Sequence, residues 1–319
     1  MDQINYYWTI FRKTLVAKLI GDTVRGFIHD NVMLYAASIA FYAIFSLPAV
    51  LILIVFVGSV FYGQQAMQGQ LYDQIAIHVG DNIALQIENI LKNVEISEAG
   101  AVGKTIGIAT LLFSATTVFV NIQLALNEIW GVRAKPKKGW LKLIIDRLFS
   151  FVIVAGLGFI LLASLLVDTA LTISERFLVR LFSDYTVYLL QMASVILLIS
   201  LLTIIFTTVF KVLPDARVRW RDVWVGALVT TLLFVIGKEL IGLYLSSSTL
   251  SSTYGAAGSL VLLLIWIYYS AVIFLLGAEF TKVYSQRVGK AIWPRKNAVK
   301  VIKKEVERDV QPAEPLPKT

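Results

Sequence analysis

Long apolar stretches recur along the chain and are separated by polar, charged segments. About 20 apolar residues are enough for a helix to cross the roughly 30 Å hydrocarbon core of a bilayer. Backbone groups in lipid must be hydrogen-bonded internally, so each stretch of that length is predicted to be a helix. Six stretches meet the requirement, at about residues 32–61, 105–126, 148–171, 186–210, 223–245 and 256–281.

Two amphipathic segments accompany these spans. Residues 7–29 carry a helical apolar stripe broken by charges, which is typical of a helix lying on a membrane surface. The connection 62–104 has apolar residues at four-residue spacing with polar ones between them, which predicts an amphipathic helical cap on the outer side. Residues 283–319 are basic, then acidic and proline-rich, and predict a cytoplasmic tail with a disordered end.

The predicted fold class is therefore all-α, a polytopic membrane protein. Residues 1–31 form a cytoplasmic amphipathic interfacial helix, and residues 32–282 form a six-transmembrane-helix bundle with the outer helical loop. The composition agrees, because 57% of the 319 residues are hydrophobic, only 16% are charged, and the mean hydropathy is +0.74.

The same composition narrows the chemistry. The chain has no cysteine, which excludes disulfides and thiolate metal sites. Its only histidines, His29 and His78, stand outside any metal-binding or catalytic motif. There is no GxxxxGK[ST] phosphate loop, so ATP hydrolysis by this chain is excluded. We expect no metal, no cofactor and no catalytic residue.

The distribution of basic residues predicts the orientation. Both termini and the second and fourth connections together hold 24 of the 29 Lys and Arg residues, in segments 1–30, 129–147, 211–222 and 282–319. By the positive-inside rule this side is cytoplasmic. Topology and anionic lipid account for the net charge of +8, so we expect membrane lipids, and no nucleic acid, as partners.

Ionisable residues inside a span are costly and are candidates for function. Lys238 and Glu239 lie about fifteen residues into the fifth span, some ~22 Å from its cytoplasmic end at 1.5 Å per residue. They either line a polar cavity for a charged substrate group or a proton, or they are structural. In the structural alternative Lys238 snorkels outward and Glu239 pairs with another helix.

Four further polar residues belong to the candidate substrate path. Glu279 lies near the inner end of the sixth span with Lys282 one turn on, which favours a helix-end ion pair over a substrate site. Asn121 and Asn127, near the end of the second span, fit interhelical hydrogen bonding or a substrate site equally well. Tyr254, in the hydroxyl-rich turn LSSSTLSSTYGAAGS, belongs either to a flexible turn or to a vestibule for an anion.

Several strings together resemble one family. They are AASIAFYAIFSLPAV at 36–50, LNEIWGV at 126–132, VLPDARVRWRDVWVGAL at 212–228 and STYGAAGSLVLLLIWIYYSAVIFLLGAEFTKVY at 252–284. The chain is similar, over about residues 20–285, to the YihY/BrkB family of bacterial inner-membrane proteins. The resemblance implies a six-span protein of the cytoplasmic membrane, linked to envelope lipid traffic and serum resistance.

Some members of that family carry an old ribonuclease BN label. RNA hydrolysis normally needs histidines or a metal-binding carboxylate cluster on a cytoplasmic face. No such constellation is present in the sequence, so we expect that the protein is not an enzyme.

Two functional hypotheses remain. The first is a transporter or flippase-like protein for a lipidic or amphipathic anionic envelope substrate, with a path through the polar parts of the second, fifth and sixth spans. The second is a non-transporting membrane scaffold that organises envelope proteins through its basic tail and surface helices. A polar path reaching Lys238 or Glu239 favours the first hypothesis.

Overall fold

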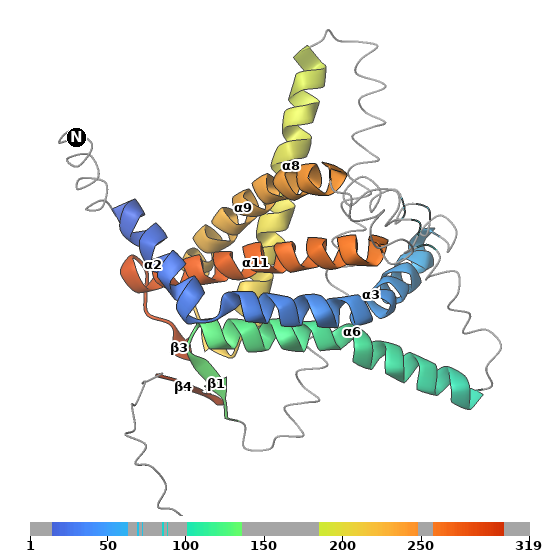
Figure 1. Cartoon of the computed structure of the whole chain (residues 1–319), viewed down its shortest axis with the longest axis horizontal. Coiled ribbons are helices and arrows are strands. Elements are labelled where there is room, and N and C mark those ends of the chain that lie inside the picture. The colour runs from blue at the N-terminus through green and yellow to red at the C-terminus, as the bar shows by residue number, and fades with distance from the viewer. Residues whose placement is uncertain are drawn as a thin grey trace, which may run out of the picture.

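The computed structural model describes residues 15–62, 69, 72, 85, 88, 101–135, 185–247 and 258–302, which are mostly helical (Figure 1). The first five helices are α2 (Leu15–His29), α3 (Val32–Tyr62), α6 (Ala101–Ile129), α8 (Tyr185–Val212) and α9 (Trp220–Ser247). The last is α11 (Gly258–Arg287). The five long helices overlap the first, second, fourth, fifth and sixth predicted spans. The third predicted span, most of the outer loop and residues 303–319 lie outside the described residues.

Three described helices are long and apolar enough to cross a membrane. They contain the stretches Val195–Val212 of α8, Trp220–Tyr244 of α9 and Leu260–Arg287 of α11. A fourth span results if α2 and the first part of α3 cross together, although they meet at an angle of 63°. Asn31 makes this bend with a φ of 53°, a left-handed conformation that Asn adopts more readily than most residues. The six-helix bundle itself stays a prediction.

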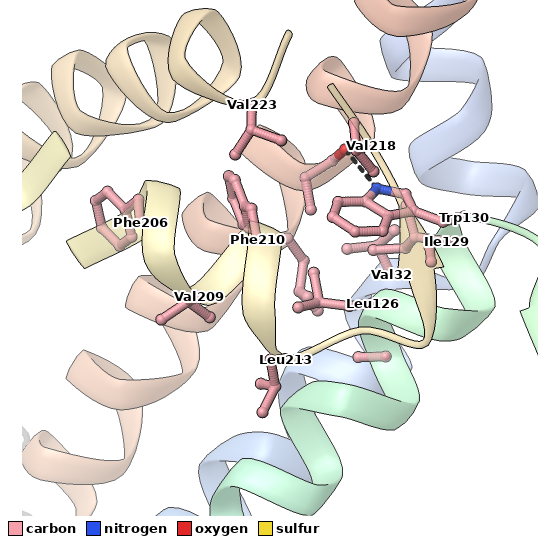
Figure 2. Packing of buried hydrophobic residues seen from close by; sticks show 14 of the residues in the cluster. Val32, Leu126, Ile129, Trp130, Phe206, Val209, Phe210, Leu213, Val218 and Val223 are labelled. Carbon is pink, nitrogen blue, oxygen red and sulfur yellow. Dashed lines mark hydrogen bonds between the residues drawn. The ribbon is translucent and has the colours of Figure 1, made fainter. Parts of the chain in front are cut away.

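The core gathers at one end of the bundle, which we call the sheet end because the short strands lie there. Phe210 of α8, Leu126 and Ile129 of α6 and Leu275 of α11 are almost completely buried. Figure 2 shows Trp130 beside them, with its indole Nε1 donating to the carbonyl oxygen of Ala278 at 3.3 Å. Helices far apart in sequence therefore converge on one aromatic cluster.

Helices α9 and α11 pack closely through two glycine–threonine contacts. A Cβ placed on Gly226 would overlap the side chain of Thr281, and one placed on Gly277 would overlap that of Thr230. Each threonine hydroxyl donates to the carbonyl of the glycine one turn before it in its own helix, both at 2.7 Å. Small residues that let backbones approach are the usual device for joining helices in lipid, where apolar burial supplies little driving force.

Two small antiparallel sheets tie the segment after α11 to the rest. Strand β1 (Val132–Ala134) pairs with β4 (Ala298–Lys300), and β2 (Ala216–Arg217) pairs with β3 (Trp293–Pro294). Arg295, next to β3, donates to the carbonyl oxygen of Lys211 at 2.9 Å and so satisfies the end of α8. None of these strands was predicted, because two or three residues are too few to show an alternating pattern.

Helix α2 exposes a stripe of apolar residues. Val16, Ile20, Val24 and Ile28 form this stripe at four-residue spacing, whereas Leu19 and Thr23 are buried against the bundle. A helix on a water-soluble protein usually buries such a stripe. The stripe therefore fits lipid contact, as expected for the predicted amphipathic helix.

The glycine–threonine contacts predict a position-specific response to added methyl groups. Gly226→Ala should destabilise the protein by about 1–3 kcal/mol, because the new Cβ cannot fit beside Thr281. Gly242→Ala on the same helix is the control; no atom lies within 4 Å of its Cβ position, so it should be neutral or stabilise by up to ~1 kcal/mol. Denaturation in detergent, followed by tryptophan fluorescence, measures both, and equal effects would contradict the close contact.

Candidate functional site

Lys238 and Glu239 lie on α9, toward the end opposite the sheets. Their closest charged atoms, Lys238 Nζ and Glu239 Oε1, are 4.0 Å apart, and the Glu239 side chain is 74% exposed against 30% for Lys238. The structure thus brings these two predicted residues together as a loose pair on the protein surface.

The surroundings of this pair are apolar. Leu228, Leu232, Ile236 and Leu240 are all exposed on the same helix, within the stretch Trp220–Tyr244 that is apolar enough to span a membrane. An exposed carboxylate on such a face meets lipid unless a polar partner covers it, and a charge in hydrocarbon costs a few kcal/mol. The pair is therefore costly in lipid unless a polar group covers it.

Glu279 belongs to a separate, buried ionic cluster at the sheet end. Its side chain is 1% exposed, and Oε1 accepts from Lys282 Nζ at 3.0 Å, so the predicted Glu279–Lys282 pair is confirmed. Lys282 also donates to Asp30 Oδ2 at 2.6 Å, and Asp30 Oδ1 lies 2.8 Å from His29 Nδ1. Asp30 was not predicted from the sequence. The feature that could have identified it is the position of an acid at the junction between the amphipathic helix and the first span.

Helix α2 reaches this cluster because Gly26 has no side chain. A Cβ there would overlap the Glu279 carboxylate, so only glycine lets the two helices come this close. A second ion pair, between Asp22 and Arg287, joins the same two helices nearer the surface. Helix α2 is thus attached to α11 through charges on both sides of Gly26.

Asn127 stabilises a loop through hydrogen bonds and does not line an open site. Its Oδ1 accepts from the backbone N–H of Asp215 at 2.8 Å, and its Nδ2 donates to Asp215 Oδ2 at 2.9 Å. Gln123 Nε2 donates to the same carboxylate oxygen at 3.3 Å. This clamp fixes the turn between α8 and α9, and Asp215 was missed although it stands in the VLPDAR string.

The remaining predicted residues are not brought to a common site. Asn121 donates to the carbonyl of Thr117 in its own helix and lies 3.4 Å from Ser38 of α3. Tyr254 lies outside the described residues. Glu279 lies midway between Gly277 and Thr281, which contact Thr230 and Gly226 of α9. It is therefore level with about residue 228 of α9, and Lys238 is ~15 Å farther along that helix. The predicted path residues therefore divide between two ends of the bundle.

A third buried acid, Asp222, also lies at the sheet end and was missed. Its Oδ2 accepts from the backbone N–H of Lys290 at 3.2 Å and from Ser285 Oγ at 3.4 Å, which anchors the end of α11 to the start of α9. In the part of the chain that the structure describes, no group of three or more His, Asp or Glu residues is placed to hold a metal ion.

Comparison with known proteins gives consistent results. The family model described as Virulence factor BrkB matches residues 23–300. A UPF0761 membrane protein of Verminephrobacter eiseniae is 31% identical over 83% of this chain and 61% of its own length. Another, of Psychromonas ingrahamii, is 28% identical over 79% of this chain and 82% of its own.

A third UPF0761 membrane protein, of Tolumonas auensis, is 34% identical over 56% of each chain. This chain therefore spans less than two thirds of the length of two of these relatives. No solved structure matches the chain.

The Asn127 clamp predicts a strong effect of one substitution. Asn127→Leu removes two hydrogen bonds from Asp215 and should destabilise the protein by ~1–3 kcal/mol, the usual cost of leaving buried polar groups unpaired. Asn121→Leu, the same change two turns earlier in α6, should cost less than ~1 kcal/mol, because Asn121 makes weaker contacts. Denaturation in detergent micelles compares them, and an equal loss would refute the special role of the clamp.

Proposed function

The chain belongs to the BrkB family of membrane proteins, and we propose that it is a transporter or flippase-like protein that moves a lipidic or amphipathic anionic envelope substrate. It works in the bacterial inner membrane with both termini in the cytoplasm, and it has no catalytic role. Membrane lipids are its partners and the source of its substrate.

The observation that carries this proposal is the Lys238–Glu239 pair on the exposed apolar face of α9. A stable membrane surface needs no charges there, because exposed leucine and isoleucine side chains already match the lipid tails. An ammonium group on that face attracts the phosphate or carboxylate of an amphipathic substrate, whose own tails stay in the lipid. The substrate head group then passes along the protein while its tails remain in hydrocarbon.

The sheet end supports the anionic class of substrate. Lys211 Nζ lies 5.2 Å from the ring centroid of Trp220, and Lys300 Nζ lies 5.9 Å from that of Trp293. Both tryptophans are more than half exposed. Exposed tryptophans beside basic residues are typical of the membrane interface, where they hold anionic head groups.

Leaflet exchange in liposomes tests the proposal. Purified protein is reconstituted with fluorescent anionic and zwitterionic lipids, and exchange is followed by quenching of the outer leaflet. Wild-type protein should exchange the anionic lipid faster than empty liposomes do. Lys238→Ala and Glu239→Gln should both abolish the increase, since each removes one charge of the pair on α9.

The matched control is Leu240→Ala, which alters an exposed neighbour without changing charge. It should exchange lipid at the wild-type rate. If both charge variants still exchange lipid faster than empty liposomes do, the substrate site does not lie at the charged pair on α9. No exchange by folded wild-type protein would overturn the transport proposal and favour the scaffold alternative.

A further inference from the structure

A line of ionisable groups runs from the protein surface into the bundle at the sheet end. His29 Nδ1 lies 2.8 Å from Asp30 Oδ1, Asp30 Oδ2 lies 2.6 Å from Lys282 Nζ, and Lys282 Nζ lies 3.0 Å from Glu279 Oε1. The side chains of His29, Asp30, Lys282 and Glu279 are 66%, 7%, 20% and 1% exposed. The line therefore begins in contact with solvent and ends at a fully buried carboxylate.

The buried end is incompletely satisfied. Glu279 Oε2 is buried and has no hydrogen-bond partner in the described structure. A buried charged oxygen without a partner is costly, and a proton on it removes the charge. The free oxygen is therefore a position where a proton is stabilised.

The charge balance of the cluster points the same way. The charged or titratable groups that act on Glu279 in the described chain are Lys282 on its own helix and Asp30 and His29 at the end of α2. Lys282 Nζ contacts the carboxylates of both Asp30 and Glu279, so one ammonium group lies between two acids. A proton on Glu279 removes a buried charge and leaves Lys282 paired with Asp30, which is favoured in a low-dielectric region.

Attachment of α2 does not require this arrangement. The Asp22–Arg287 pair already joins α2 to α11 with one acid and one base. A purely structural bridge at Lys282 would need only Asp30. The second acid is left without a structural reason.

We infer that Glu279 is a proton-binding site, reached from the surface through His29, Asp30 and Lys282, and that it couples the proposed transport to a proton gradient. The coupling rests on the proposed function, whereas proton binding by Glu279 does not. His29 takes a proton from a hydronium ion at Nε2 and passes its Nδ1 proton to the Asp30 carboxylate. Lys282 gives a proton to Glu279, forming an O–H bond at Oε1, and the protonated Asp30 returns one to the Lys282 amine. A turn of the His29 ring then restores its starting tautomer. The net change is one proton moved from water to Glu279.

Two readouts separate the inference from the transport proposal. The first is infrared difference spectroscopy of the purified protein between alkaline and acid pH, which detects the carbonyl band of a protonated carboxylic acid. The chain has 21 Asp and Glu residues, so the informative signal is one component of this band, which should be present in wild-type protein, missing in Glu279→Gln and still present in Asp22→Asn. Asp22→Asn is the matched control, because it breaks the other ion pair between the same helices.

The second readout is lipid exchange in liposomes that carry a pH gradient in either direction. The rate of lipid exchange by wild-type protein should change with the direction of the pH gradient. Glu279→Gln should still exchange lipid, but at a rate that does not depend on the gradient. His29→Asn changes an exposed side chain and should slow the response of lipid exchange to the pH gradient. This variant replaces Glu279→Gln in the experiment if Glu279→Gln does not fold.

Each outcome decides one of the two proposals. If the rate of lipid exchange by wild-type protein does not depend on the pH gradient, the proton coupling is wrong and the transport proposal is unaffected. Absence of exchange overturns transport, and the infrared band then decides proton binding alone. A band unchanged by Glu279→Gln overturns Glu279 as the proton site.

Discussion

The close contact between α9 and α11 orients the polar groups at the sheet end. Gly277 and Thr281 are one turn apart and face α9, while Glu279, two residues from each, points to the opposite side of α11. On that side Gly26 lets α2 approach, so the carboxylate is enclosed between two helices. If the threonines were not accommodated by glycines, α11 would shift or rotate and Glu279 would lose its burial against Gly26 of α2.

The acids of the sheet end are buried, whereas the surface of the helices is apolar. The buried acids Asp30, Asp222 and Glu279 all lie at the sheet end, and each has a hydrogen-bonding partner there. The outer surfaces of α2 and α9 are by contrast lined with exposed leucine, isoleucine and valine. In lipid, side-chain hydrogen bonds and close packing hold helices together. The sheet end thus supplies much of the cohesion that a soluble protein obtains from its apolar core.

The sequence predicted those features that depend on local pattern. Five long helices and the Glu279–Lys282 pair follow from apolar run length and from residues three apart on one helix. Asp30 and Asp215 were missed because their partners are 252 and 88 positions away, a pairing that no periodicity reveals. The strands were missed because each has only two or three residues and pairs with a strand far along the chain. The exposure of Glu239 could not be predicted from the sequence either, because a helical pattern does not show which neighbouring helix covers each face.

The two charged sites are linked through the same helix pair. Lys238 lies ~15 Å along α9 from the level of Glu279, too far for direct electrostatic contact. Yet α9 and α11 are joined by interlocking glycines and threonines that leave no room for sliding. A movement of α11 on protonation of Glu279 must therefore carry α9 with it or break this contact. Because rigid helices transmit displacement along their length, the proton site and the exposed pair on α9 belong to one mechanical unit.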